Sequence, residues 1–341
     1  TIRNEMREFP SGKIKWWMLP KYAPKLKTMI KYRNATLQDV FDECKLTKEA
    51  QAVLIANSGD MGEPPEDLSI FAYIGLFGGY NTGAYYPTHH FEGYINGLAN
   101  KITQSEGSHI YYETEVTKIN EEAGEITSVE TKNGKTFTAK KGFICNMDPQ
   151  KAAQDLIGWD KFPKSDQKKL SYEYSMTGLM LYLGLDDNID RRDDRFGKIN
   201  IWHLEQWDMN KMWREQTDMN MEKPWFFMST PTLHTDDKSH TPPGCQILEA
   251  ALFMGHEPFA EAKKKSYAEY MKLKLKMANR LIDLIEEKYI PNLRKHIKVK
   301  QIGSPTTNED FVMAPKGNAY GSRMTPENMG PGRLKPTTPF K

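Results

Sequence analysis

The sequence lacks the features that most readily identify a nucleotide-binding or membrane-spanning chain. It contains no Gly-x-Gly-x-x-Gly run, the turn that a dinucleotide-binding fold places between a strand and a helix so that the backbone can approach a pyrophosphate. It has no run of about 18 apolar residues, so no transmembrane helix is expected. No segment is typical of a signal peptide.

Cysteine is scarce, and the charges nearly cancel. Cys44, Cys145 and Cys245 are odd in number and far apart, which argues against a disulfide framework or a CxxC site and favours a reducing compartment. Lys plus Arg number 47 and Asp plus Glu number 45, so the net charge of +2 gives no overall field for nucleic acid. Aromatic and basic residues are not interleaved in a single-strand-binding pattern. No nucleic-acid partner is therefore expected.

The chain does have enough apolar material for a sizeable core. With 341 residues, 38% hydrophobic and 11% aromatic, it predicts about two interleaved domains. Strands are predicted at 175–185, 198–204, 224–230 and 245–254, and a long helix at 258–288. Strands grouped between helical segments indicate an α+β domain built on a sheet.

Residues 83–149 carry the most informative local pattern. An aromatic-proline turn at 83–87 leads into an amphipathic helix predicted at 91–104. A β-rich segment follows, with a strand bearing Glu115-Val116, a hairpin signal at Asn133-Gly134 and an apolar strand at 142–146.

Shorter signals precede this region. Thr36 and Thr47 are predicted N-caps of two short helices, and Pro64-Pro65 is predicted to begin another that runs through Ile74. The glycines at 75, 78, 79 and 83 have the wrong spacing for phosphate binding, and a structural loop is predicted there.

Several motifs occur in an order typical of one enzyme group. They are Gly-Asp-x-Gly-x-Pro-Pro at 59–65, Gly-Ala-Tyr-Tyr-Pro at 83–87, Ser-Pro-x-Thr-Asn at 304–308 and Gly-x-x-Tyr-Gly at 317–321. Over roughly residues 50–325 the chain resembles the phytoene desaturase, carotenoid isomerase and retinol saturase group of FAD-dependent oxidoreductases. It departs from the group's pattern where His89-His90 replace a glycine pair and Met147 replaces an alanine.

The resemblance implies a fold and a division of the chain. The fold would combine α+β and α/β parts: a partial FAD-binding domain, Rossmann-like and of amine-oxidase type, interleaved with a substrate domain of sheet plus helices. Residues 1–90 would form a helical, substrate- or membrane-facing region, 91–150 part of the FAD-binding domain, 151–300 the substrate domain and 301–341 the return toward the FAD-binding domain. The chain is expected to be a fragment without the glycine-rich turn and without the group's C-terminal flavin segment.

The resemblance also suggests site residues, each with a structural alternative. His89 and His90 would act in catalysis as proton donors or acceptors, or else one would cap the following helix and the other lie half exposed. No metal site is predicted around them. A polyene tunnel would be lined by Tyr85, Tyr86 and Phe91, which would otherwise be plain core. FAD would be contacted by Val116, Asn146, Asp148, Gly317 and Gly321, although capping of the helix that begins at Pro149 is favoured for Asp148.

The function implied is FAD-dependent oxidation, reduction or isomerisation of C=C bonds in a carotenoid or retinoid-like polyene lipid. The alternatives are a flavin amine oxidase of the same broad fold and a non-catalytic lipid-binding relative. The basic, aromatic segment 13–32, with Trp16 and Trp17, favours peripheral contact with a membrane surface, in the cytoplasm or in an organelle; its alternative is a solvated helix pair. The acidic cluster at 186–194 lacks the order of a calcium loop and is interpreted as solvated.

Overall fold

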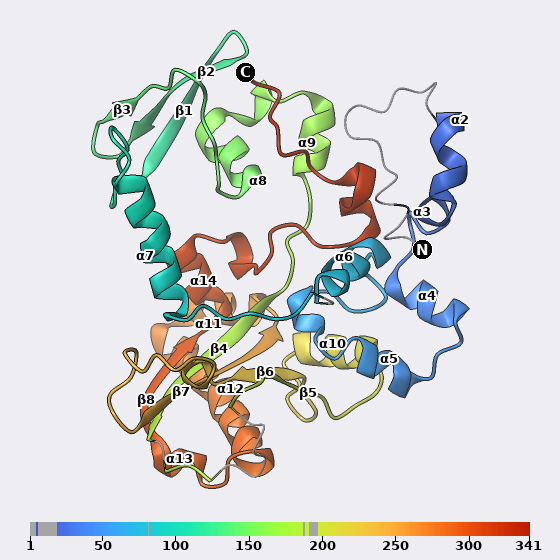
Figure 1. Cartoon of the computed structure of the whole chain (residues 1–341), viewed down its shortest axis with the longest axis vertical. Helices are drawn as coiled ribbons and strands as arrows, with labels where there is room; N and C mark the ends of the chain where they lie inside the picture. The colour runs from blue at the N-terminus through green and yellow to red at the C-terminus, as the bar shows by residue number, and fades with distance from the viewer. Residues whose placement is uncertain (1–4, 6–18, 81, 187, 191–196) are drawn as a thin grey trace.

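The computed structural model describes residue 5 and residues 19–80, 82–186, 188–190 and 197–341. Trp16 and Trp17 of the predicted membrane-facing segment lie outside these residues, as does most of the acidic cluster at 186–194. A large antiparallel sheet, a group of N-terminal helices beside it and a small distant sheet form the described molecule (Figure 1). This mixture of helix and sheet confirms the predicted fold class.

The large sheet has five strands in the order β5-β6-β7-β4-β8, and every neighbouring pair is antiparallel. The four predicted strands are confirmed; a fifth, β8, is not predicted by the sequence pattern. The strands are β4 (Thr177–Asp186), β5 (Ile201–His203), β6 (Phe226–Ser229), β7 (Cys245–Met254) and β8 (Ile297–Gly303).

One face of this sheet is covered by a long helix, α12 (Tyr267–Lys288). Alternate residues of β4 are fully buried on that face, where they pack with the apolar stripe of α12. The buried β4 residues are Leu179, Leu181, Leu183 and Leu185. The single helix predicted at 258–288 is wrong in one respect, because α11 (Glu257–Lys265) ends before α12 begins. Ser266 is extended between them and its hydroxyl accepts from the Glu269 amide, which caps α12.

The N-terminal helices pack beside the sheet around a second apolar cluster that includes Leu37, Phe41 and Phe253 (Figure 1). Both predicted N-caps are confirmed, since Thr36 and Thr47 accept from the amides of Asp39 and Ala50. The helices of this part are α4 (Leu37–Glu43), α5 (Lys48–Leu54), η3 (Ser58–Asp60), α6 (Ile70–Tyr80) and α10 (Met209–Thr217). The short helices α2 (Leu19–Tyr22), η2 (Ala23–Leu26) and α3 (Lys27–Lys31) precede them in the chain and contribute no residue to the cluster.

Two predictions around α6 are wrong. The helix begins at Ile70 rather than at Pro64, because Ser69 forms an antiparallel bridge with Thr36 that keeps the chain extended before the helix. It also runs through Gly75, Gly78 and Gly79, which were predicted to form a loop. Each glycine costs a helix about 1 kcal/mol relative to alanine, and the buried side chains at the start of α6 offset that cost by packing.

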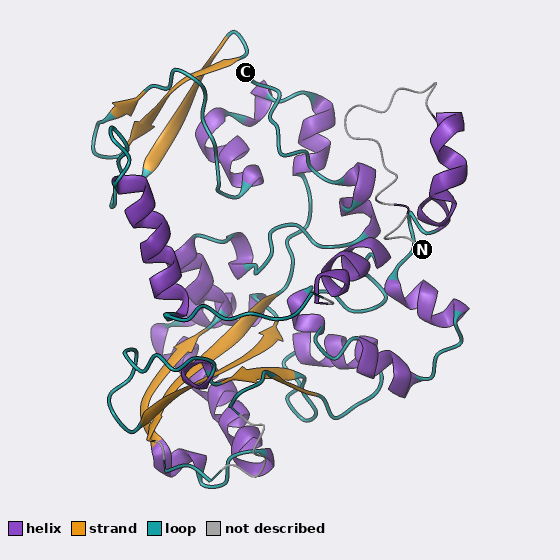
Figure 2. Cartoon of the chain, in the orientation of Figure 1, coloured by secondary structure: helices purple, strands orange, loops and turns teal. Residues whose placement is uncertain are grey.

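The small sheet lies at the opposite end of the molecule, connected by α7 (His90–Thr103) (Figure 1). Its strands are β1 (Val116–Glu122), β2 (Glu125–Thr131) and β3 (Thr136–Phe137), in that order and antiparallel. The predicted helix at 91–104 and the hairpin at Asn133-Gly134 are confirmed, with Gly134 at a φ of 79°. The predicted strand at 142–146 is wrong: no described strand pairs with it, and Ile144 is 97% exposed (Figure 2).

The remaining elements are short, and those at 149–170 lie between the small sheet and the large sheet in the chain. The C-terminus reaches the small sheet, where Lys341 exchanges backbone hydrogen bonds with Gly124 and Ile126, and Phe340 packs on Phe162. The predicted division into four segments stays a prediction. These elements are α8 (Pro149–Lys151), the π-helical turn η4 (Ala152–Ile157), η5 (Trp159–Lys161), α9 (Lys164–Leu170), η6 (Pro231–Leu233), α13 (Leu293–His296), α14 (Pro305–Val312), η7 (Pro315–Gly317), η8 (Pro326–Asn328) and η9 (Gly330–Gly332).

Candidate functional site

A cavity of about 600 Å³ lies against the face of the large sheet that α12 does not cover. We call it the sheet cavity. Because side chains alternate along a strand, Met180 lies on the face of β4 opposite to the buried leucines and lines this cavity. Its sheet wall is largely apolar and is made by Gly178, Met180, Trp202, Phe227, Ala251 and Phe253, with the amide of Asn200 beside them just before β5.

The opposite wall of the sheet cavity carries a group of polar side chains, which we call the polar corner: Asn57, Asp60, Tyr80 and Tyr320. They come from η3 and the residue before it, from the end of α6 and from the turn at 317–321. The Tyr80 hydroxyl donates to Asp60 Oδ2, and the Tyr320 hydroxyl donates to the Gly59 carbonyl at 2.6 Å. Three segments distant in the sequence therefore meet at one end of an apolar space.

Burial sets the electrostatics of the polar corner. It raises the pKa of Asp60, although hydrogen bonds from Tyr80 and Asn57 act in the opposite direction. Burial, assisted by the Asp60 charge, raises the pKa of Tyr320 to about 12. Burial and the hydrogen bond to Asp60 also raise the pKa of Tyr80. Both phenols therefore keep their protons at neutral pH and act as donors.

The polar corner is held rigidly by its neighbours. Trp225 is 2% exposed, and its indole donates to the Ala56 carbonyl at 2.6 Å. A Cβ on Gly59 would lie 2.2 Å from the Trp225 ring, so only glycine fits beside it. The buried Gln216 side chain accepts from the Trp225 amide and donates to the carbonyls of Trp225 and Phe253. These contacts fix the backbone that carries Asp60.

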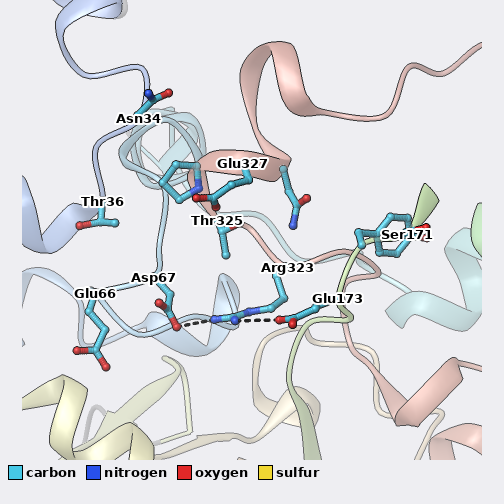
Figure 3. A pocket seen from close by; sticks show the side chains of 12 residues that line it. Asn34, Thr36, Glu66, Asp67, Ser171, Glu173, Arg323, Thr325 and Glu327 are labelled. Carbon is cyan, nitrogen blue, oxygen red and sulfur yellow. Dashed lines mark hydrogen bonds and ion pairs between the residues drawn. The ribbon is translucent and has the colours of Figure 1, made fainter. Parts of the chain in front are cut away.

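A second pocket, of about 420 Å³, is polar and is shown in Figure 3. Arg323 spans it, with ion pairs to Asp67 at 2.5 Å and to Glu173 at 3.3 Å. Arg323 also pairs at 2.7 Å with Glu63, whose side chain is 2% exposed. Burial raises the pKa of Glu63 while the Arg323 hydrogen bonds oppose that rise. The network ties the loop after η3 to the segment after Tyr320, and so positions both sides of the polar corner.

The histidines predicted to act in catalysis do not line the sheet cavity. His90 is buried, with Nε2 3.1 Å from the Asp237 carbonyl and Nδ1 3.2 Å from the Tyr86 hydroxyl. His89 is exposed; its Nδ1 lies 2.9 Å from Asp237 Oδ2, and it makes no side-chain cap to α7. Hydrogen bonds from Ser239 and then His89 lower the pKa of Asp237. The pair thus joins the start of α7 to the loop before β7, and its catalytic role stays a prediction.

The predicted tunnel residues gather at the same turn. The Tyr86 ring packs edge-on against His90, Phe91 and His234. Tyr85 is 90% exposed and Phe91 is 61% exposed, and only their neighbour Ala84 lines the sheet cavity. Within the described residues, no group of three His, Cys, Asp or Glu side chains is arranged to hold a metal ion.

The predicted cofactor contacts fall into two places. Gly317 and Gly321 flank Tyr320 beside the sheet cavity, where the Gly317 carbonyl accepts from Thr177 and the Gly321 carbonyl from Ser175. A Cβ on Gly317 would lie 2.0 Å from the Pro305 carbonyl oxygen, and Gly317 has a φ of 62°, so the fold itself requires glycine there.

The other three predicted contacts lie toward the small sheet. Val116 begins β1, which pairs only with β2 among the described strands, and Asn146 is exposed. Asp148 caps α8 by accepting from the Lys151 amide at 2.8 Å, which confirms the favoured capping role. It also accepts from the hydroxyls of Tyr172 and Tyr174, at 2.9 and 3.0 Å. Contact of these residues with FAD stays a prediction.

Sequence reasoning missed the residues that define the sheet cavity. Asp60 lies inside the Gly-Asp-x-Gly-x-Pro-Pro motif, and that motif was the available signal. Trp202 and Phe227 lie on predicted strands, where alternation along the strand could have placed them on the face opposite to the core. Tyr320 lies inside the Gly-x-x-Tyr-Gly motif, which was its signal, whereas nothing local pointed to Tyr80.

The comparisons with known proteins agree with the motifs. No family model matches the chain. It is 24% identical to the all-trans-retinol 13,14-reductase of Danio rerio over 317 residues, covering 88% of this chain and 51% of that protein. It is 26% identical to the chloroplastic prolycopene isomerase of Arabidopsis thaliana over 289 residues, covering 82% of this chain and 44% of that protein. The chain thus spans about half the length of the curated relatives it matches.

A solved oxidoreductase from Methanosarcina mazei has a similar fold. The TM-score is 0.51 at 13% identity, over 87% of this chain and 67% of that one. This likeness supports the fold alone, whereas the sequence relatives agree with the motif order. The chain is therefore a relative of the retinol reductases and prolycopene isomerases, in accordance with the resemblance that its motifs predict.

Proposed function

We propose that the protein is an FAD-dependent oxidoreductase that acts on C=C bonds of a carotenoid or retinoid-like polyene. The observation that carries this proposal is the sheet cavity, whose volume of about 600 Å³ and wall of Trp, Phe and Met side chains suit a long apolar chain. The names of the relatives, a retinol reductase and a prolycopene isomerase, support the same substrate class. Desaturation, saturation and cis–trans isomerisation all fit this proposal.

Two places in the chain suit the two ends of FAD, the adenine and the flavin. β1 is an edge strand, so backbone groups near Val116 are available to an adenine. A Cβ built on Gly321 meets nothing within 4 Å, so the backbone of the turn beside the sheet cavity is open on that side. Bound FAD would supply or accept the hydride, while this chain would orient the polyene along the sheet wall and exclude water from it.

We also propose that the protein collects its substrate at a membrane surface, in the cytoplasm or in an organelle. Apolar side chains at the end of α14 support this, with Phe311 84% exposed, Val312 71% and Met313 56%. Lys264 and Lys265 end the neighbouring helix α11 and would meet anionic headgroups, whereas Lys263 pairs with Asp310 of α14 at 2.6 Å. None of the helices among the described residues is both long and apolar enough to cross a bilayer.

Cofactor and substrate uptake test the proposed function together. The purified protein is titrated with FAD and, separately, with a polyene, and both visible absorbance and tryptophan fluorescence are recorded. Uptake of both is expected, with flavin bands at roughly 375 and 450 nm. A protein that binds a polyene but no FAD would instead be a non-catalytic lipid-binding relative. A protein that binds neither would contradict the proposal.

The membrane surface has its own test. Phe311→Ser is expected to weaken sedimentation with vesicles containing anionic lipid, while Val299→Ser, at a 55% exposed residue of β8, is expected to have no effect. Equal sedimentation of both variants and the parent protein would exclude the α14 tip as the contact.

A further inference from the structure

We propose that Asp60 is the proton donor of the sheet cavity: its carboxyl takes up a proton when an apolar chain fills the cavity, and it gives that proton to a carbon of the chain. This inference rests on the proposed function and assigns a catalytic residue to it. Two features of the site carry it, a carboxyl without a countercharge and an aromatic wall that faces an apolar ligand.

The first feature is the isolation of the Asp60 charge. Of the described residues that line the sheet cavity, Asp60 alone has an acidic or basic side chain, and the asparagine amides that line it carry dipoles without net charge. The Tyr80 hydroxyl donates to Asp60, but a phenol that keeps its proton does not neutralise a carboxylate. Glu63, in the same motif, differs because it pairs with Arg323 at 2.7 Å.

The second feature is the wall that a ligand would contact. Trp202, Phe227 and Met180 offer an apolar surface, so a hydrocarbon chain lying on it would displace water from the cavity. Such a chain forms no hydrogen bond that replaces the lost hydration of a carboxylate. A carboxylate that loses water without gaining a countercharge binds a proton instead. Burial by the protein alone already raises the pKa of Asp60, and the ligand would add to the same effect.

The Asp60 carboxyl has little freedom to avoid the ligand by turning toward solvent. Its hydrogen bond to Tyr80 holds it on the cavity side, and Gly59 is wedged against the Trp225 ring. The Gly59 carbonyl is in turn held by the Tyr320 hydroxyl at 2.6 Å. Proton uptake is therefore the response that the fold leaves open to Asp60.

A protonated carboxyl beside a polyene supplies the proton that saturation of a C=C bond requires. One carbon receives a hydride from a hydride donor of the reduced-flavin class, and the π-electron pair moves to the other carbon. That carbon forms its new C–H bond with the Asp60 proton, while the electron pair of the broken O–H bond stays on the carboxylate. Water returns the proton to Asp60 after the product leaves.

Proton uptake on ligand binding tests the inference without any turnover. The purified protein is titrated with diphenylhexatriene, a fluorescent polyene hydrocarbon without a polar group. Calorimetry in phosphate and in Tris, whose ionisation enthalpies differ, counts the protons taken up. We expect uptake approaching one proton per bound ligand at neutral pH. The affinity is expected to fall by up to about tenfold per pH unit between the pKa of Asp60 in the free protein and its pKa in the complex.

Three variants assign the proton to a residue. Asp60→Asn is expected to abolish the uptake and to make the affinity independent of pH. Tyr80→Phe removes a hydrogen bond that favours the carboxylate, so uptake is expected to extend to higher pH. Glu249→Gln is the matched control, since Glu249 is another half-buried carboxyl but does not line the sheet cavity. It is expected to leave the uptake unchanged.

Turnover of the FAD-loaded protein tests the donor role itself. Asp60→Asn is expected to lower kcat by roughly 100- to 10,000-fold with little change in KM, as loss of a general acid does. Tyr80→Phe is expected to shift the high-pH limb of the kcat profile to higher pH, which a merely structural role of Asp60 would not produce. An unchanged kcat in Asp60→Asn would overturn the donor role.

The outcomes separate this inference from the proposed function. Binding of diphenylhexatriene by the unaltered protein without proton uptake would overturn the inference alone, as would uptake that persists in Asp60→Asn. Absence of binding at every pH would refute the proposed function as well.

Discussion

The large and the small sheet are both antiparallel, but apolar residues are buried in the large sheet and exposed around the small one. In the large sheet, the four alternate leucines of β4 are at most 1% exposed, because α12 lies over them. Around the small sheet, Val116 is 37% exposed and Ile144 is 97% exposed. An apolar pattern therefore specifies which face of an element requires cover, but a second layer has to supply that cover.

Helix α7 shows the same contrast. Its apolar stripe has the spacing that the sequence predicts, as has the stripe of α12. The α12 stripe is buried in the core, whereas the α7 side chains remain open among the described residues: Phe91, Tyr94, Ile95, Leu98 and Ile102 are each between 48% and 61% exposed. Helical periodicity alone does not distinguish the two situations.

The largest expected difference between the two regions is the cost of removing an apolar side chain. Phe226→Ala in the large sheet is expected to lower the free energy of unfolding by about 3–5 kcal/mol, because Phe226 is fully buried and its removal leaves a cavity. Ile144→Ala is expected to change it by less than about 0.5 kcal/mol. Urea unfolding followed by circular dichroism measures both. A comparable loss for Ile144→Ala would break the comparison.

The next largest expected effect is that of removing the ion pairs of Arg323. Arg323→Met leaves the Glu63 carboxylate buried without its partner and is expected to lower the free energy of unfolding by about 2–3 kcal/mol. Arg294→Met removes an ion pair with Asp283 whose side chains are 42% and 51% exposed, and is expected to cost at most about 1 kcal/mol. The same unfolding experiment compares the two, and adding Glu63→Gln to Arg323→Met should recover part of the loss.

A smaller effect is expected from removing the cap of α8, which follows the small sheet in the chain. Asp148→Ala removes the α8 cap and the acceptor for two tyrosine hydroxyls, so we expect a loss of about 1–2 kcal/mol. Asp155→Ala, at an exposed residue of η4, should lie within about 0.5 kcal/mol of the unaltered protein. Thermal unfolding of the three proteins would show whether this end of the molecule depends on the cap.

The smallest effect is a dependence on pH. Burial raises the pKa of Glu249 on β7 above 4.5, so the folded state holds this proton more tightly than the unfolded state. The protonated Glu249 side chain therefore contributes its full stability at a pH below its pKa in the unfolded state. This contribution is lost as the pH rises through its pKa in the folded state. Relative to the unaltered protein, Glu249→Gln is thus expected to gain stability from pH 4 to pH 7. Parallel stability profiles for the two proteins would contradict the assigned burial effect.

Local features were predicted well because their causes are local. The caps at Thr36, Thr47 and Asp148 involve residues within about three positions of each other, and β4 and β7 follow from alternation within ten residues. The helix with Gly75 and Gly78 was missed because packing outweighs the poor propensity of glycine.

The sequence by itself determined four of the five strands of the large sheet, β4 to β7, and the caps and the hairpin at Asn133-Gly134. It also determined the motif order that relates the chain to retinol reductases and prolycopene isomerases. Only the tertiary structure decided that Asp60, Tyr80 and Tyr320 form one polar corner and that the strand predicted at 142–146 is absent. The Tyr320 hydroxyl binds a carbonyl 261 residues away, and a strand exists only where another strand pairs with it. Contacts of this kind depend on which distant segments meet, and no local pattern encodes that choice.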